Sequence, residues 1–386
     1  MKKQTIVLVI DGLGVGEFEK NDELYECNTL KSISQFSDLK GSIFDMSLDF
    51  QNHQYKIGEY LISQGFSKLK HKGADSFLGH KEIMCDDYSV EHLYINDFYE
   101  EIEKALASKY KIDFDFHCII LNNSIVISNN VESDIGLNIN VLGILDSVSF
   151  DEICYVGEFI KKIINPSRVI IMGGKPLNIE KMKQSVISRY DITTNKLVYG
   201  IKIPKTGIYN ENYIVYHLTK DSKENVINRF IENNKNVALL GKTADMFDVE
   251  SAAKEHIVET NKLLLTLMDY IKSNTYDFIF ANIQELDLAG HSQDVSKAAD
   301  VINTFLDYLP KILDCIDDGI LIITADHGND PLCGHSYHTR EKVPIYMFSR
   351  EIYRKDIGTR ETLSDIGAMI CKYNNLPIIG SSKSFI

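Results

Sequence analysis

Three short apolar runs in this chain are each followed, within four residues, by an aspartate. Residues 5–10 lead to Asp11, residues 278–283 to Asp287 and residues 319–323 to Asp326. In open α/β sheets the carboxyl ends of the parallel strands share one edge, and ligands bind at that edge. The sequence therefore predicts a largely parallel sheet that gathers three carboxylates in one place.

Three histidines accompany these aspartates. His291 comes four residues after Asp287, His327 directly follows Asp326, and His338 lies eleven residues beyond His327. Mixed oxygen and nitrogen ligands suit Mn²⁺ or Zn²⁺, and six ligands exceed what one tetrahedral ion uses, which favours two ions. Any one aspartate alone is usually a helix cap or turn residue, and any one histidine an ordinary core or surface group, so the prediction depends on the whole set.

Strands and helices alternate along the chain, which indicates an α/β fold. Between about residues 87 and 205 the pattern changes to short strands and Asn-rich turns, without metal-type clusters. We therefore expect a metal-binding catalytic core built from residues 1–86 and 206–386, with an inserted cap domain at residues 87–205. The expected strands are residues 5–10, 117–121, 168–172, 236–240, 278–283, 319–323 and 344–348. The expected helices are residues 91–110, 150–164, 223–233, 249–273, 295–315 and 361–373.

Ser76 is a candidate nucleophile. It follows Asp75 and precedes Gly79 in a segment that can begin a helix. Helix N-termini favour anions such as phosphate, and a metal bound to the hydroxyl oxygen would lower the pKa of the serine and generate the nucleophile without a histidine base. Taken alone, Asp-Ser before a helix is more often a capping signal. A glycine-rich loop, residues 11–17, is also expected to let the backbone approach a metal and a substrate.

Composition limits the partners and the location. The formal net charge of −14 argues against a general nucleic-acid binder, because phosphate backbones require Lys- and Arg-rich surfaces. The seven cysteines are dispersed, as expected for reduced cytosolic thiols. No segment approaches the roughly 20 apolar residues that a membrane-spanning helix needs. We expect a soluble, cytoplasmic protein with no nucleic-acid or membrane partner, and nothing in the sequence indicates its oligomeric state.

Several segments together resemble the phosphopentomutases, a branch of the alkaline-phosphatase superfamily close in its core to the cofactor-independent phosphoglycerate mutases. The matching segments occur in the family's order and span most of both core regions. They are residues 11–17, 28–30, 75–84, 241–245, 326–331, 338–341 and 365–368. The resemblance implies an alkaline-phosphatase-like three-layer core with a mostly parallel sheet, plus an inserted α/β cap domain.

The resemblance also implies a two-metal phosphomutase that converts ribose 1-phosphate to ribose 5-phosphate and is primed by a sugar bisphosphate. A phosphorylated hydroxyl, here Ser76 in place of the family's threonine, would pass its phosphoryl group to the small-molecule sugar phosphate. The two ions would be Mn²⁺, with Mg²⁺ or Zn²⁺ as alternatives. One would be held by Asp287, His291 and His338, and the other by Asp11, Asp326, His327 and Ser76.

The cap region departs from the family pattern. Asn122-Asn123-Ser124 stands where the family has Ala-Asp-Ser, and an arginine-rich segment is reduced to the surroundings of Arg189. We expect Asn123, Arg189 and, beside His338, Arg340 to contact the substrate. The two arginines would supply the cationic groups that a sugar phosphate needs against its distal phosphate. The alternative function is a phosphatase, or another phosphoryl or phosphonate hydrolase of the same superfamily, with water as the acceptor. A third interpretation is a catalytically silent binding protein.

Overall fold

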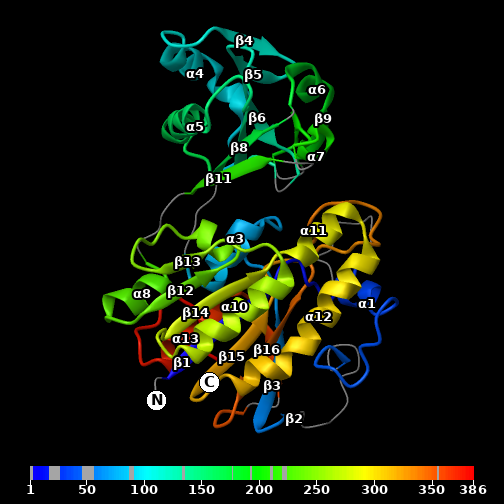
Figure 1. The fold of residues 1–386 in the computed structure, drawn as a ribbon, viewed down its shortest axis with the longest axis vertical. Helices are drawn as coiled ribbons and strands as arrows, with labels where there is room; N and C mark the ends of the chain where they lie inside the picture. The colour runs from blue at the N-terminus through cyan, green and yellow to red at the C-terminus, as the bar shows by residue number, and fades with distance from the viewer. Residues whose placement is uncertain are drawn as a thin grey trace. The chain divides into compact units, whose positions relative to one another are not determined.

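The computed structural model describes residues 3–16, 27–45, 56–86, 91–132, 135–175, 177–191, 194–208, 212–219, 224–353 and 356–386. The chain divides into two compact units (Figure 1). Unit 1 comprises Met1–Tyr88 and Ser222–Ile386, and unit 2 comprises Ser89–Asp221. The return to unit 1 lies near residue 222 rather than near residue 206, because strand β11 (Tyr213–Thr219) pairs antiparallel with β8 (Arg168–Gly174) of unit 2.

The sheet of unit 1 is parallel through its centre. The described strands follow the order β13 (Ala253–Glu255), β12 (Val237–Leu240), β14 (Phe278–Ile283), β1 (Gln4–Ile10), β15 (Gly319–Thr324), β16 (Val343–Ser349), β3 (Tyr60–Ser67) and β17 (Asp356–Arg360). Neighbours from β13 to β15 are parallel, whereas β16 is antiparallel to β15 and to β3, and β2 (Lys56–Ile57) pairs with β3. Every residue of β1 and β14 is buried, as expected for apolar strands that are covered on both faces.

Two groups of helices cover this sheet, which gives the three-layer core expected from the sequence. In the first group, α12 (Val295–Asp314) contacts α1 (Thr29–Ile33), α10 (Thr260–Lys272) and α11 (Glu285–Ser292). In the second, α3 (Ser76–Ile83) contacts α9 (Thr243–Met246) and α13 (Ser364–Tyr373), and α13 contacts α8 (Val226–Glu232). Figure 1 shows α10 and α12 crossing the near face of the sheet. None of the described helices is both long enough and apolar enough to cross a membrane.

Unit 2 is a second α/β structure. Its sheet has the order β11, β8, β7 (Asn138–Ile144), β6 (Ile125–Asn130), β10 (Lys196–Ile201) and β9 (Val186–Asp191), and β5 (Cys118–Leu121) joins β4 (Ile112–Asp115) to β6. The long helix α5 (Phe150–Ile164) packs on β7, β8 and β11. The shorter helices are η1 (Ile95–Phe98), α4 (Tyr99–Leu106), α6 (Ile179–Gln184) and α7 (Ile203–Thr206).

One predicted helix begins later than expected, and two cysteines that are distant in the sequence lie together. The helix expected at residues 249–273 begins only at Thr260, because residues 253–255 instead form β13 and satisfy their backbone groups by pairing with β12. The cysteines are dispersed in the sequence, but Cys27 and Cys333 lie together in the fold, with their Cα atoms 5.3 Å apart, a separation that a disulfide can span. The two residues are 306 positions apart, a separation that only the tertiary fold can close.

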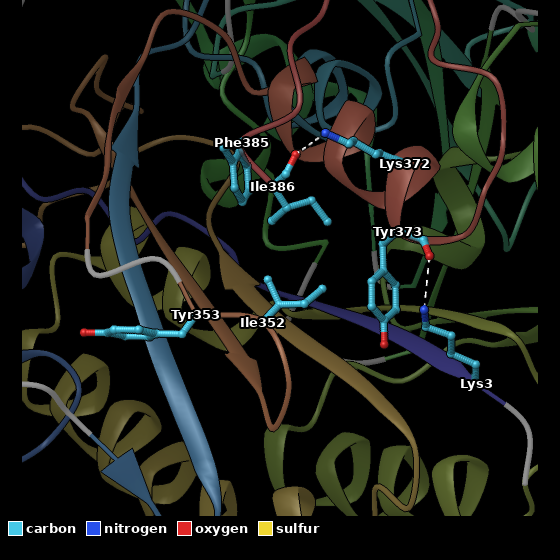
Figure 2. A pocket seen from close by; sticks show the side chains of 7 residues that line it. All are labelled: Lys3, Ile352, Tyr353, Lys372, Tyr373, Phe385 and Ile386. Atoms are coloured by element: carbon cyan, nitrogen blue, oxygen red, sulfur yellow. Dashed lines mark hydrogen bonds between the residues drawn. The ribbon is translucent and has the colours of Figure 1, made fainter.

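A surface pocket of about 620 Å³ lies at the opposite end of β1 from Asp11 (Figure 2). It is lined by Lys3, Ile352, Tyr353, Lys372, Tyr373, Phe385 and Ile386. Lys3 directly precedes β1, whereas Asp11 directly follows it. The two lysines of the pocket donate hydrogen bonds to backbone oxygens. Lys3 donates to that of Tyr373 at 3.3 Å, and Lys372 donates to that of Ile386. The pocket is therefore separate from the site that Asp11 helps to form.

Candidate metal centre

Strands β1, β14 and β15 bring the three predicted aspartates to one edge of the unit 1 sheet. Asp11 directly follows β1, Asp326 lies just beyond β15, and Asp287 lies in the first turn of α11, the helix after β14. Because β1 pairs in parallel with both β14 and β15, the three strands end at the same edge. All three side chains are buried.

The first group of donor atoms belongs to Asp11, Asp326 and His327, and these atoms lie within 4.8 Å of one another. Nδ1 of His327 is 3.1 Å from the carbonyl oxygen of Gly328, so in the neutral ring this nitrogen carries the proton and the lone pair is on Nε2. Nε2 lies 3.2 Å from Oδ2 of Asp326 and 3.5 Å from Oδ1 of Asp11, yet it is buried without a hydrogen bond. A buried lone pair that faces two carboxylates fits a divalent cation of the Mn²⁺ or Zn²⁺ type.

The second group belongs to Asp287, His291 and His338. The two Nε2 atoms are 3.1 Å apart, and each lies within 3.4 Å of a carboxylate oxygen of Asp287. Nδ1 of His291 lies 2.8 Å from the carbonyl oxygen of Ser336, and Nδ1 of His338 lies 2.8 Å from that of Ala74. These contacts place the protons on Nδ1 and the lone pairs on Nε2, as in histidines that bind metals.

The two groups adjoin one another. The donor atoms of Asp287, His327 and His338 also lie within 4.8 Å of one another, so His327 stands between the groups. Burial and the Asp326 carboxylate raise the pKa of Asp11 to about 6. Burial lowers the pKa of His338 to about 4, which favours its neutral, ligating form. Burial alone would also lower the pKa of His327, but the carboxylates around it, led by Asp326, raise it to about 10, so a cation at its Nε2 would displace a proton. The charge and donor pattern therefore fits two cations, with His327 and its two aspartates around one and Asp287, His291 and His338 around the other.

The hydroxyl of Ser76 lies against the first group. Helix α3 begins at Ser76, and the side chain of Asp75 caps it by accepting the N–H of Leu78 at 3.1 Å. Oγ of Ser76 is 2.5 Å from Oδ2 of Asp326 and 3.5 Å from Oδ1 of Asp11. Asp75 therefore caps helix α3, which leaves the hydroxyl of Ser76 free of capping and facing the two carboxylates.

Lys242, which follows β12, is part of the same centre. Its Nζ lies 2.8 Å from Oγ of Ser76 and 2.8 Å from Oδ2 of Asp11. The same Nζ atom also lies 3.7 Å from Oδ2 of Asp287. Burial alone would lower the pKa of Lys242, but the surrounding carboxylates outweigh it and raise this pKa above its usual value. Lys242 is therefore a fixed positive charge beside the candidate nucleophile.

If the phosphoryl transfer implied by the sequence resemblance takes place at Ser76, replacing Lys242 with methionine is expected to lower its rate about a hundredfold, because a preorganised donor at the reacting oxygen is lost. Methionine keeps much of the length of the side chain, so the packing around β12 is largely retained. Steady-state rates of the metal-loaded enzyme measure the effect. Lys262→Met, at an exposed position of α10, is the matched control and should leave the rate unchanged. A wild-type rate in Lys242→Met would contradict the role of Lys242.

A chain of hydrogen bonds through His80 and Asn282 connects Ser76 to Asp11. Nδ1 of His80 donates to the carbonyl oxygen of Ser76 at 2.8 Å, and its Nε2 accepts from Nδ2 of Asn282 at 2.8 Å. The same Nδ2 donates to Oδ2 of Asp11 at 3.0 Å. All four residues are buried. His80 lies within a segment that matches the phosphopentomutases, residues 75–84, whereas nothing in the sequence singled out Asn282, which lies within β14.

The glycine-rich loop after β1 contacts a predicted metal ligand at its first glycine and the carboxylate of Glu341 further on. The N–H of Gly12 donates to Oδ1 of Asp326 at 3.2 Å. A Cβ on Gly14 would lie 2.2 Å from Oε2 of Glu341. The same carboxylate accepts the N–H of Gly16 at 3.0 Å and both the N–H and the hydroxyl of Thr29, at 2.9 and 2.8 Å. Gly14 and Gly16 therefore have a structural role, which is close packing on a buried glutamate, whereas the approach of the loop at Gly12 to a metal stays a prediction.

Glu82, near the end of α3, ties the helix that presents Ser76 to two loops. Its carboxylate accepts hydrogen bonds from Nδ1 of His71 at 2.6 Å, from the hydroxyl of Thr362 at 2.6 Å and from the N–H of Leu363 at 2.8 Å. Burial alone would raise the pKa of Glu82, but these bonds, led by that from His71, lower it from 4.5 to about 2. Glu82 therefore stabilises the fold in its charged form.

Glu82→Gln is expected to lower the free energy of unfolding by roughly 3 kcal/mol at pH 7, the value that the pKa shift implies. Because the folded-state pKa of Glu82 lies below the unfolded value of 4.5, its contribution is present above pH 4.5 and is lost as the pH falls towards 2. Urea unfolding at pH 7 and pH 3 measures both effects, and the difference between wild type and variant should shrink at pH 3. Glu361→Gln, at a side chain that is 78% exposed, is the control.

Two of the three predicted substrate residues, Arg189 and Arg340, have other partners in this structure. The guanidinium of Arg340 donates to the carbonyl oxygens of Leu69, His71 and Gly73, in the loop that precedes α3. In unit 2, Asn123 lies in the turn between β5 and β6, and Arg189 of β9 donates to the carbonyl oxygen of Val131 at 3.1 Å. Their contact with a substrate stays a prediction.

Comparison with known proteins identifies the family. The family model of the metalloenzyme superfamily matches residues 3–378. The chain belongs to the metalloenzyme superfamily. This membership, with the donor groups above, confirms that the protein is a metalloenzyme.

Relatives within the superfamily carry the name phosphopentomutase. The chain is 24% identical to the phosphopentomutase of Aeromonas salmonicida over 415 aligned residues, which cover 100% of both chains. It is 31% identical to that of Aeromonas hydrophila subsp. hydrophila over 166 residues, which cover 42% of this chain and only 41% of the relative. The phosphoglycerate mutase of Leishmania mexicana matches with a TM-score of 0.52 at 13% identity, over 100% of this chain and 97% of that one. The last match shows a shared fold, and the first two confirm the resemblance seen in the sequence.

Proposed function

We propose that this chain is a metal-dependent phosphomutase that moves a phosphoryl group on a small-molecule sugar phosphate through a phosphorylated Ser76. The substrate pair would be ribose 1-phosphate and ribose 5-phosphate, the cofactors two Mn²⁺ ions, and the activator a sugar bisphosphate. The observation that carries this proposal is the position of the Ser76 hydroxyl, 2.8 Å from Nζ of Lys242 and 2.5 Å from Asp326. The names of the full-length relatives support the choice of a mutase.

Bound cations would neutralise the charge on the transferring phosphoryl group and would be held by the two donor groups. In the forward transfer, the bond between phosphorus and Oγ of Ser76 breaks, and phosphorus bonds to the acceptor hydroxyl of the sugar. The proton of that hydroxyl ends on Oγ. The Lys242 ammonium stabilises negative charge on Oγ as it becomes the leaving oxygen. The reverse transfer, from the other position of the sugar, then restores phosphorylated Ser76.

Phosphorus NMR of the Mn²⁺-loaded enzyme, given α-ribose 1-phosphate and a catalytic amount of a sugar bisphosphate, tests the proposal. The proposal predicts ribose 5-phosphate with little inorganic phosphate. Stoichiometric inorganic phosphate would instead establish the phosphatase, because water would then be the acceptor. Conversion that does not depend on the bisphosphate would contradict the proposed priming step.

A further inference from the structure

A cysteine pair lies beside the loop that carries His338. Cys27 and Cys333 are both buried, with exposed fractions of 2% and 7%, and their Cα atoms are 5.3 Å apart, which is usual for a disulfide. Hydrogen bonds hold the same two segments together, since the N–H of Asn28 donates to Asp330 at 2.8 Å and the N–H of Asn329 donates to Thr29 at 3.2 Å. These bonds would keep the two thiols close to each other after reduction, so the disulfide can re-form.

His335 faces this pair with an N–H group. Its Nδ1 accepts the backbone N–H of Tyr337 at 3.2 Å, so in the neutral ring the proton is on Nε2. Nε2 lies 3.7 Å from Sγ of Cys333. An N–H beside the sulfur stabilises a thiolate at Cys333 and makes it the better leaving group in thiol–disulfide exchange. The donor atoms of Cys27, Cys333 and His335 also lie within 4.8 Å of one another, as in a zinc cluster, but a protonated Nε2 does not ligate zinc.

The segment between Asp330 and His338 connects the cysteine pair to the second donor group. Ser336, three residues after Cys333, provides the carbonyl oxygen that lies 2.8 Å from Nδ1 of His291. His338, five residues after Cys333, contributes its own Nε2 to the group. A change in this segment at Cys333 therefore acts on the orientation of two imidazoles around Asp287.

We propose that Cys27 and Cys333 form a reversible thiol–disulfide site whose redox state sets the affinity of the second donor group for its metal ion. The co-reactant is a small-molecule or protein dithiol. Its thiolate attacks Sγ of Cys27, the bond between the two protein sulfurs breaks, and the Cys333 thiolate leaves. The second thiol of the reductant then displaces Cys27, so that the protein gains two electrons and two protons while the dithiol becomes a disulfide. The thiol chemistry is independent of the proposed phosphomutase reaction, whereas its effect on the rate rests on that function.

Thiol counting on the denatured full-length protein tests the site itself. After incubation with an oxidised dithiol, five thiols are expected, and seven after reduction, because the chain has seven cysteines and five lie outside the pair. Cys333→Ser should give the same count before and after reduction, whereas Cys315→Ser, outside the pair, should still gain two thiols. Seven thiols in the oxidised sample would overturn the proposal. So would one zinc ion per chain bound by the reduced protein and lost in Cys333→Ser.

Calorimetric titration of the native protein with Mn²⁺ tests the coupling to the metal centre. Reduction is expected to weaken one of two binding events about tenfold, as for other groups that orient a ligand, and reoxidation should restore it. Cys333→Ser should behave like the reduced protein in both conditions. His335→Gln should keep the affinity of the oxidised protein but slow its reduction by a dithiol at least about threefold. Equal Mn²⁺ affinity in both redox states would overturn the coupling, whatever the enzyme's activity on sugar phosphates.

Discussion

Ser76→Ala is expected to reduce phosphoryl transfer by at least about a thousandfold, because alanine offers no oxygen to carry the phosphoryl group. Alanine is a good helix former, and the cap at Asp75 is retained, so α3 should still begin at the same residue. Phosphorus NMR gives the rate, and thermal unfolding of the same samples shows whether the fold is intact.

Ser76→Thr is the matched control for this loss. Threonine keeps the hydroxyl. It is also the residue that the resemblance to the phosphopentomutases implies at this position. We expect Ser76→Thr to retain a rate within about tenfold of wild type, since only a methyl group is added. Wild-type turnover in Ser76→Ala would rule out a phosphorylated Ser76 intermediate.

Asp287→Asn is expected to lower the bound metal from two ions to one per chain and to reduce phosphoryl transfer about a thousandfold. Asp287 is the carboxylate that both His291 and His338 approach, and asparagine removes its charge with almost no change in shape. A loss of this size corresponds to the several kcal/mol that a metal ion contributes to the transition state. Elemental analysis of gel-filtered protein gives the number of ions.

Asp300→Asn, at an exposed position of α12, removes the same charge outside the donor groups and should keep two ions and the wild-type rate. Two ions and full activity in Asp287→Asn would show that the second donor group is not a metal site. If Asp287→Asn does not unfold cooperatively and is therefore not folded, Asp287→Glu replaces it in the comparison. Glutamate keeps the charge, and this variant should keep the second ion with weakened affinity.

The strands that carry the ligands could be predicted closely because their signal is local. Residues 278–283 form β14 as expected, and residues 319–323 fall within β15, since each is an apolar run of strand length before a turn. Because parallel strands end at the same edge of a sheet, these strands then predict that Asp11, Asp287 and Asp326 lie together. The spacing of four residues between Asp287 and His291 is also readable, because it places both side chains on one face of α11.

Contacts that depend on the tertiary fold could not be predicted in this way. Lys242 follows β12, and only the order of strands in the sheet places it beside Asp11 and Ser76. The strand-end rule used for the aspartates, applied to β12, would have found it. Asn282 and the pairing of Cys27 with Cys333 had no comparable signal, because each depends on neighbours that are distant in the sequence.

Anomalous diffraction from crystals grown with Mn²⁺ tests most directly whether two cations lie beside Ser76. We predict two manganese peaks, one among Asp11, Asp326, His327 and the Ser76 hydroxyl, and one among Asp287, His291 and His338. Crystals with these side chains ordered but no manganese peak between them would contradict both the metal centre and the phosphoryl transfer proposed to take place there.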